Sequence, residues 1–177
     1  MRKLLLLILI GSHAYGGQLT HTTAEVDEQL DGVYAEIYAN SQTNVQTIVG
    51  SATVYTLVTN FTANGDSAHC TADYANSKIT LTKNGEYSIG LHTSFGASVS
   101  GDNWFGVVFA GTNELPDIHF ERKIGNANDH GSAGAGGFYN CTNAPIDITY
   151  RVRHSEVGVS IDLTKTYMNL NVHRIGL

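Results

Sequence analysis

The sequence predicts an all-β fold, an antiparallel two-sheet jelly-roll sandwich, preceded by one short N-terminal helix. From Val45 onward, apolar and polar residues alternate with a period of two, as they do in half-buried strands. Asn84-Gly85 separates two such runs, and Asn-Gly between alternating runs is a strong hairpin signal. Only residues 20–39 have the spacing of an amphipathic helix. The helix is therefore expected to be an addition to the sandwich and not its core.

The composition indicates one globular domain and argues against two kinds of partner. Of the 177 residues, 42% are hydrophobic and 15% are charged, with 19 glycines, which suits strands joined by tight turns. The net charge is −6, whereas binding to nucleic acid or to an anionic membrane surface needs a basic footprint. No apolar run reaches the length of a membrane-spanning helix. We therefore expect no nucleic-acid partner and no membrane span.

Residues 1–16 resemble a secretory signal. Arg2 and Lys3 are followed by an apolar run at 4–10 and a small-x-small site at 12–14, in the order of a signal peptide. The alternative is an apolar terminus that stays on the chain and docks into a partner.

Residues 17–44 are expected to form a helical stalk. Thr22 and Glu25 have the spacing of a capping box, in which each side chain satisfies a free backbone N–H. Four apolar residues then recur at spacings of 4, 3 and 4, as in a coiled-coil seam: Val26, Leu30, Val33 and Ile37. Two heptads are too few for an independent coiled coil. The seam therefore either joins three copies of the chain, which we expect, or packs the helix on its own domain.

Residues 45–177 are expected to form the sandwich, from about eight to ten short strands. The alternating runs lie at 52–61, 79–91, 104–110, 118–124, 146–154, 158–163 and 167–175. A flexible loop is expected at 125–137, which is rich in glycine. Tyr150 and Tyr167 belong to polar, partly aromatic strand faces. Such faces are either solvated or packed against a neighbouring subunit, and for these two tyrosines we expect a subunit contact.

Cys70 and Cys141 are a candidate disulfide, which would suit an oxidising compartment. If paired, they would close a long loop and stabilise the fold by roughly 4 kcal/mol. Neither belongs to a Cys-x-x-Cys pair, so a zinc site is not expected. The alternative is two buried thiols.

Five segments, in this order, resemble the trimeric jelly rolls of the tumour-necrosis-factor and complement globular-head superfamily: GEYSI at 85–89, WFGVVFAGTN at 104–113, FERKIG at 120–125, ITYRV at 148–152 and MNLNVHRI at 168–175. The likeness is closest to the heads of bacteriophage tail fibres and virion surface proteins, and residues 23–31 resemble the short helix that often precedes them. The chain departs from the pattern at 144–147, which read APID where relatives usually begin the strand with Gly-Asp. A calcium site known in some relatives is therefore not carried over.

The resemblance implies a non-enzymatic homotrimer of fibre type on a virion surface, which attaches to a host or decorates a shell. Its partners would be copies of itself, a cell-surface glycan or protein receptor, and other virion proteins. The alternative is a secreted lectin or receptor ligand of the complement-head type. Loop residues that could contact a ligand are Asn103, Trp104, Asp129, His130 and Tyr139, although core packing explains Trp104 equally well.

The sequence carries no catalytic signature. It has no Gly-x-Ser-x-Gly elbow, phosphate loop, dinucleotide fingerprint or His-Glu-x-x-His motif, so we expect neither an enzyme nor a cofactor. The eight histidines include no pair at spacings of 2 or 4, and no metal site is expected. His154 and His173 are weak candidates, because one histidine facing a threefold axis would supply three imidazoles.

Overall fold

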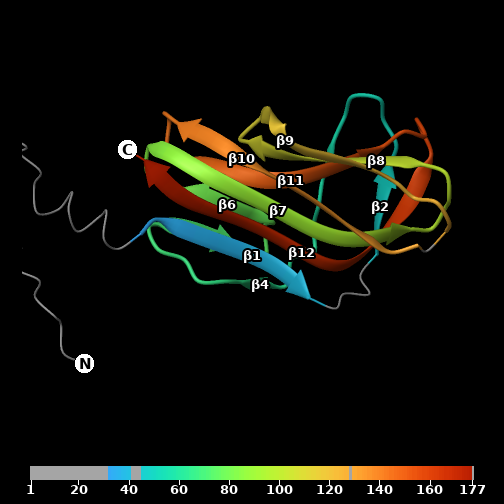
Figure 1. Ribbon diagram of the computed structural model, residues 1–177, viewed down its shortest axis with the longest axis horizontal. Helices are drawn as coiled ribbons and strands as arrows, with labels where there is room; N and C mark the ends of the chain where they lie inside the picture. Colours follow the sequence, from blue (N-terminus) through green and yellow to red (C-terminus); the bar gives the residue numbers. More distant parts are fainter. Residues whose placement is uncertain (1–31, 41–44, 128, 177) are drawn as a thin grey trace, which may run out of the picture.

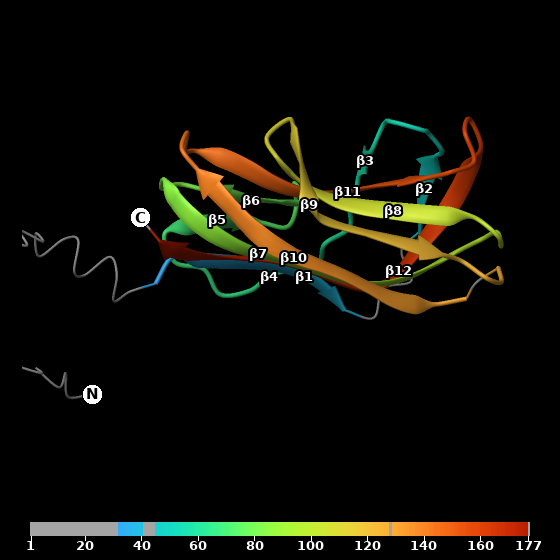
Figure 2. The ribbon, with the colours of Figure 1, turned by 45° about the horizontal axis from the view of Figure 1, so that its top comes forward.

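The computed structural model describes residues 32–40, 45–127 and 129–176, and within these ranges every regular element is a β-strand. The strands form two antiparallel sheets stacked face to face, with the apolar core between them (Figures 1 and 2). Figure 1 looks onto the sheet called sheet A below, and sheet B lies behind it. The predicted two-sheet all-β sandwich is confirmed.

Sheet A has the strand order β10-β7-β12-β1-β4, with β2 beside β12. Its strands are β1 (Tyr34–Asn40), β2 (Val45–Val49), β4 (Ala63–Asn64), β7 (Gly85–Ala97), β10 (Gly131–Cys141) and β12 (Ser160–Gly176). Sheet B has the order β5-β6-β11-β8-β9, with β3 beside β11. Its strands are β3 (Thr56–Leu57), β5 (Cys70–Asp73), β6 (Lys78–Leu81), β8 (Asn103–Ala110), β9 (Asn113–Lys123) and β11 (Ile146–His154).

Large aromatic side chains fill the space between the sheets. Trp104 is fully buried and meets Phe95 of the opposite sheet edge-on, with 5.9 Å between ring centroids. Tyr150 is 1% exposed and packs against Phe120, at 6.3 Å. The expectation that Tyr150 contacts a neighbouring subunit is therefore wrong, because its side chain points into the core of its own sandwich.

The N-terminal segment differs from the sequence prediction. Residues 34–40 form strand β1, paired antiparallel with β12, where a helix was expected. Val33 and Ile37 are 2% and 0% exposed and lie in the chain's own core, so neither faces a seam between helices. The sequence YAEIYAN also alternates with a period of two, and the long strand β12 gives it a partner. Val26 and Leu30 lie outside the described residues.

The Asn84-Gly85 turn joins the two sheets and is not a hairpin. Strand β6 belongs to sheet B and β7 to sheet A. The Asn84 Oδ1 atom accepts a hydrogen bond from the backbone N–H of Ala144, at 2.8 Å. Gly85 has a φ of +142°, and a Cβ there would lie 2.5 Å from the carbonyl oxygen of Gly176. The turn residues were recognised correctly, but the sheet to which each strand belongs depends on pairing with distant strands.

Part of the expected glycine-rich loop is a strand. Residues 131–141 form β10, which pairs with β7 along its whole length. Glycine is unfavourable in a strand, but eleven consecutive residue pairs with β7 outweigh that cost.

The two cysteines are free thiols, and both are buried. Cys70 begins β5 in sheet B, whereas Cys141 ends β10 in sheet A. Burial raises the pKa of each thiol. The structure thus has the second of the two alternatives, a pair of buried thiols.

A β-bulge in β12 places a lysine inside the sandwich. The register with β7 shifts between Lys165 and Tyr167, which leaves Thr166 as the extra residue. Lys165 points inward and is 1% exposed, and its Nζ donates to the Gln46 Oε1 atom at 2.8 Å and to the Thr59 carbonyl at 3.0 Å. Removal from water lowers the pKa of Lys165 to about 8.

Lys165→Met should change how the free energy of unfolding depends on pH. The native lysine loses its proton near pH 8, whereas the unfolded lysine keeps it up to about 10.4. The unfolded state therefore binds more protons between these values, and this residue contributes stability that rises with pH. Urea unfolding at pH 7.5 and 10 should show wild type gaining about 2 kcal/mol relative to the variant. Taking this difference removes the opposing effect of the buried tyrosines and thiols. Parallel curves for the two proteins would contradict the account.

Candidate functional site

The part of the outer face of sheet B formed by β8 and β11 is covered by the chain itself. Tyr55, just before β3, meets Phe109 edge-on with 5.9 Å between ring centroids. The Arg153 guanidinium carbon lies 3.9 Å from the Phe105 ring centroid and 5.1 Å from that of Tyr55. Under this layer Val107 is fully buried although it is outside the main core. Over β8 and β11, sheet B thus covers much of its outer face within one molecule.

The outer face of sheet A has no such cover among the described residues. Alternate residues of β10, β7, β12 and β1 point outward and line up in four rows across the sheet. The rows, in that strand order, are Phe138-Ser88-His173-Tyr34, Gly136-Gly90-Asn171-Glu36, Gly134-His92-Asn169-Tyr38 and Ser132-Ser94-Tyr167-Asn40. We call these sixteen residues the sheet A face.

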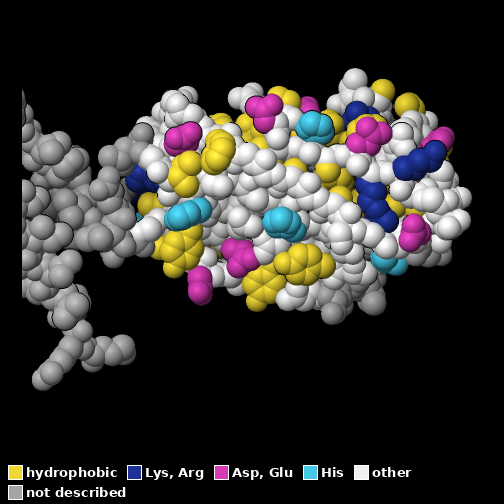
Figure 3. Space-filling view, viewed as in Figure 1, with side chains coloured by type: hydrophobic (Ala, Val, Ile, Leu, Met, Phe, Trp, Pro, Cys, Tyr) yellow, Lys and Arg dark blue, Asp and Glu magenta, His cyan; other side chains and the backbone are white. Residues whose placement is uncertain are grey.

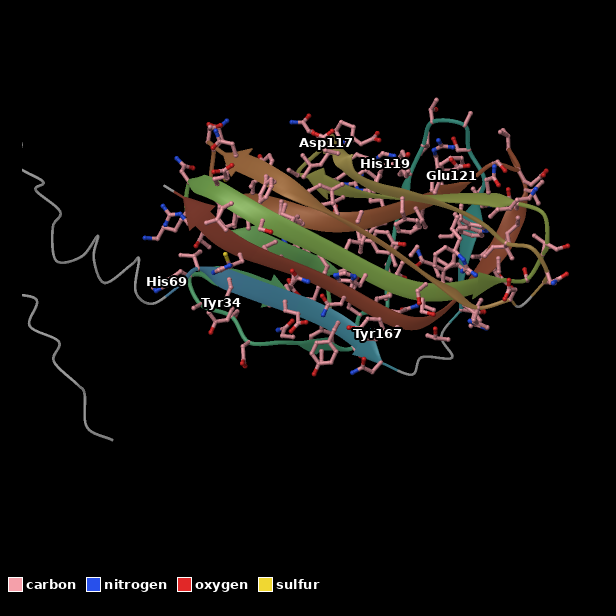
Figure 4. All side chains as sticks on the ribbon, in the orientation of Figure 1. Tyr34, His69, Asp117, His119, Glu121 and Tyr167 are labelled. Atoms are coloured by element: carbon pink, nitrogen blue, oxygen red, sulfur yellow. The ribbon has the colours of Figure 1, made fainter. Side chains whose placement is uncertain are left out.

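The aromatic residues of the sheet A face are exposed at its margins. Phe138 is 67% exposed, Tyr167 41% and Tyr34 38%. In Figure 3 side chains without charge cover most of this view, with hydrophobic groups around the edges. Figure 4 shows Tyr34 and Tyr167 on the side of the face formed by β1 and β12. Such aromatic groups in water are typical of surfaces that bind another protein.

Glu36 is the only carboxylate among the sixteen residues, and it belongs to a hydrogen-bond chain. The Asn169 Nδ2 group donates to the Glu36 Oε1 atom, and the Asn171 Nδ2 group donates to the Asn169 Oδ1 atom at 2.7 Å. Asn169 is 8% exposed. The chain holds three neighbouring side chains in fixed orientations, which lowers the entropy that a partner must remove on binding.

Two adjoining hollows lie along the β7–β10 side of the face, because glycines leave gaps there. The larger has a volume of about 630 Å³ and the smaller about 360 Å³. Both are lined by His92 and Gly134, so the imidazole stands between them. A Cβ at Gly90 would lie 2.8 Å from the Asn171 Oδ1 atom. A larger residue at position 90 would therefore displace the Asn171 side chain, which donates to Asn169.

The predicted ligand residues fall into two groups. Asp129 and His130 are exposed in the β9–β10 loop, and Asn103 is half-buried where β8 begins, near the same end of the sandwich. Trp104 is fully buried in the core, and Tyr139 is half-buried and packs against it. Trp104 therefore cannot contact a ligand, while the first three residues stay candidates.

The two histidines named as weak metal candidates have different surroundings. His154 is fully buried: its Nδ1 atom lies 2.9 Å from the Asp102 Oδ2 atom and its Nε2 atom lies 3.0 Å from the Ile48 carbonyl oxygen. Because its side chain is fully buried inside the sandwich, His154 cannot face a threefold axis and share a metal ion with other copies. His173 is exposed on the sheet A face. Among the residues described, no three His, Cys, Asp or Glu side chains are grouped to hold a metal.

His154, at the end of β11, contacts Asp102 in the loop before β8 and Ile48 of β2. This buried group therefore holds three separate segments together. Asp102→Asn should destabilise the fold by about 2 kcal/mol, because an amide has one acceptor atom where the buried carboxylate contacts both the His154 ring and the Ser155 hydroxyl, so one buried polar group loses its partner. The matched control is Asp147→Asn, which breaks the Lys78–Asp147 pair at 2.9 Å, whose side chains are 32% and 40% exposed. Exposed pairs contribute about 1 kcal/mol or less. Urea unfolding at pH 7 measures both, and equal losses would contradict the assignment.

Sequence reasoning found Tyr167 but missed most of the sheet A face. His92 was not singled out, and Tyr34, Glu36 and Tyr38 were assigned to a helix. The alternation in YAEIYAN was the available signal for β1. The rows themselves could not be found, because they depend on the register of four strands far apart in the sequence.

Comparison with known proteins identifies the fold. No protein-family model matches the chain, and no curated protein matches its sequence. The structure of Eiger TNF from S. frugiperda matches at 9% identity and a TM-score of 0.53, covering 81% of this chain and 92% of that one. The globular domain of zebrafish complement 1qA protein matches at 14% identity and 0.56, covering 81% and 97%. The PRD1 vertex protein matches at 12% identity and 0.49, covering 80% and 72%.

The chain thus has the fold of the Eiger TNF and complement 1qA globular-domain structures, a jelly roll, as the sequence resemblance implied. None of the described residues forms a helix that could span a bilayer.

Proposed function

We propose that the chain is the head of a non-enzymatic homotrimer, in which each copy covers the sheet A face of another. The observation that carries this proposal is the contrast between the two sheets. Over β8 and β11, sheet B has its aromatic rings covered by Tyr55, Arg151 and Arg153, whereas the sheet A face leaves three aromatic side chains and two hollows in water. The resemblance to a superfamily of trimeric heads supports the same stoichiometry.

The trimer would act as a surface or fibre-type head that attaches to a host or decorates a virion shell. Tyr34 of β1 pairs with His173 of β12, so both ends of the described chain lie at one end of the sandwich (Figure 1). The β7–β8, β9–β10 and β11–β12 connections lie at the other end. Asp129 and His130 would there meet a cell-surface glycan or protein, and three copies on one particle would multiply a weak contact.

The second candidate is a secreted lectin or receptor ligand. It is favoured by the likeness to the complement 1qA globular domain, of which 97% is covered, and by the signal-like residues 1–16. Both candidates place the protein outside the cell, on a virion surface or secreted, and both use the same trimer. They differ in what the trimer is attached to.

Light scattering should give three times the mass of one chain, and Tyr167→Asp should weaken this assembly. The new carboxylate would be covered without a partner, which should raise the concentration for half-assembly at least about tenfold. Tyr74→Asp is the matched control, because Tyr74 is 42% exposed and lies at the β5–β6 turn, outside the face. A monomeric wild type, or equal behaviour of the two variants, would refute the proposed trimer contact.

A further inference from the structure

We propose that acid weakens the trimer, because it places positive charge on His92 within the covered sheet A face. This inference rests on the proposed function and adds a means of regulation to the same face. Three features of the described residues carry it: the position of the imidazole, the scarcity of negative charge around it, and the lack of side chains on its glycine neighbours.

His92 stands where assembly would enclose it. It is exposed in the single chain and lies between Gly134 of β10 and Asn169 of β12 in its row. It lines both hollows. Side chains of another copy that fill the two hollows would therefore contact the ring from both sides and remove it from water.

The groups that face His92 offer little negative charge. Strand β10 carries no charged residue, and on β12 the outward neighbours are Tyr167, Asn169, Asn171 and His173. On β7 itself, Glu86 lies three outward positions away, next to the end of β12. On β1, Glu36 is two strands away, roughly 10 Å, and its carboxylate accepts a hydrogen bond from Asn169. The nearby tyrosines stay neutral in acid.

The glycines beside His92 have no side chain that could compensate a positive charge on its ring. Gly134 and Gly136 present no side chain that could turn toward the ring, and Gly90 precedes it on the same face of β7. A neutral imidazole can be covered at low cost, whereas an imidazolium without a carboxylate loses its hydration and gains no ion pair. Histidine changes its charge between about pH 5 and 8, so this is the interval in which assembly should weaken. Three copies would each add one charge.

The test is the concentration for half-assembly, measured by light scattering at about pH 8 and about pH 5.5. Wild type should require at least about tenfold more protein at the lower pH. His92→Gln keeps a polar side chain that stays neutral, and its half-assembly concentration should change less than about threefold. His119→Gln is the control, because His119 lies on β9, away from the sheet A face (Figure 4), and it should respond to acid like wild type.

Circular dichroism at both pH values checks that the strands persist, so that loss of mass is not unfolding. If His92→Gln responds to acid as strongly as wild type, the proposal is overturned. If instead His173→Gln alone abolishes the response, the assignment to His92 is wrong. A wild type that is trimeric at both pH values overturns this inference alone, whereas a monomer at pH 8 overturns the proposed function as well.

Discussion

The bulge in β12 decides which side chains of this strand reach water and which reach the core. Before it, Leu163 and Lys165 point inward; after it, Met168 and Leu170 do. Since side chains alternate across a strand, an unbroken β12 would turn Tyr167 into the core and Met168 outward. The bulge thus brings a tyrosine to the sheet A face and places a lysine among apolar neighbours. The hydrogen bonds of Lys165 to Gln46 and Thr59 compensate for part of that cost.

The two sheets have unequal surroundings. Over β8 and β11 of sheet B, Tyr55 and the stacked side chains of Arg151 and Arg153 cover the aromatic rings, so little of the apolar surface there is left for a partner. Sheet A instead shows sixteen outward residues in rows, with one carboxylate, and three of them are glycines beside hollows that another molecule can fill. A sheet face with few charges and aromatic margins resembles the buried centre of a subunit contact more than an ordinary solvated surface. We infer that the chain's own residues cover the β8 and β11 part of sheet B, and that other copies of the chain cover the sheet A face.

Much of the sandwich could be predicted from the sequence, because alternation with a period of two is a local signal. It indicated the runs that became β7, β8, β11 and β12, and it indicated the polar outer face of β12 with Tyr167. The sequence was misleading where pairing with a distant strand decides whether a segment is a strand and to which sheet it belongs. YAEIYAN fits a helix and a strand alike, and pairing with β12 and β4 makes it a strand. The glycine-rich residues 131–137 are typical of a loop, but pairing with β7 makes them part of a strand. Asn84-Gly85 marks a turn without showing that the chain passes from one sheet to the other there.

Hydroxyl-radical footprinting tests most directly whether other copies of the chain cover the sheet A face. The oxidation rates of Tyr34, Tyr167 and Phe138 would be compared in concentrated and in dilute protein, with Tyr74 as the internal reference, since its exposure of 42% is close to that of the two face tyrosines. The account predicts that the three rates fall in concentrated protein while that of Tyr74 does not change. If all four keep the same relative rates at both concentrations, the sheet A face is not where the copies meet.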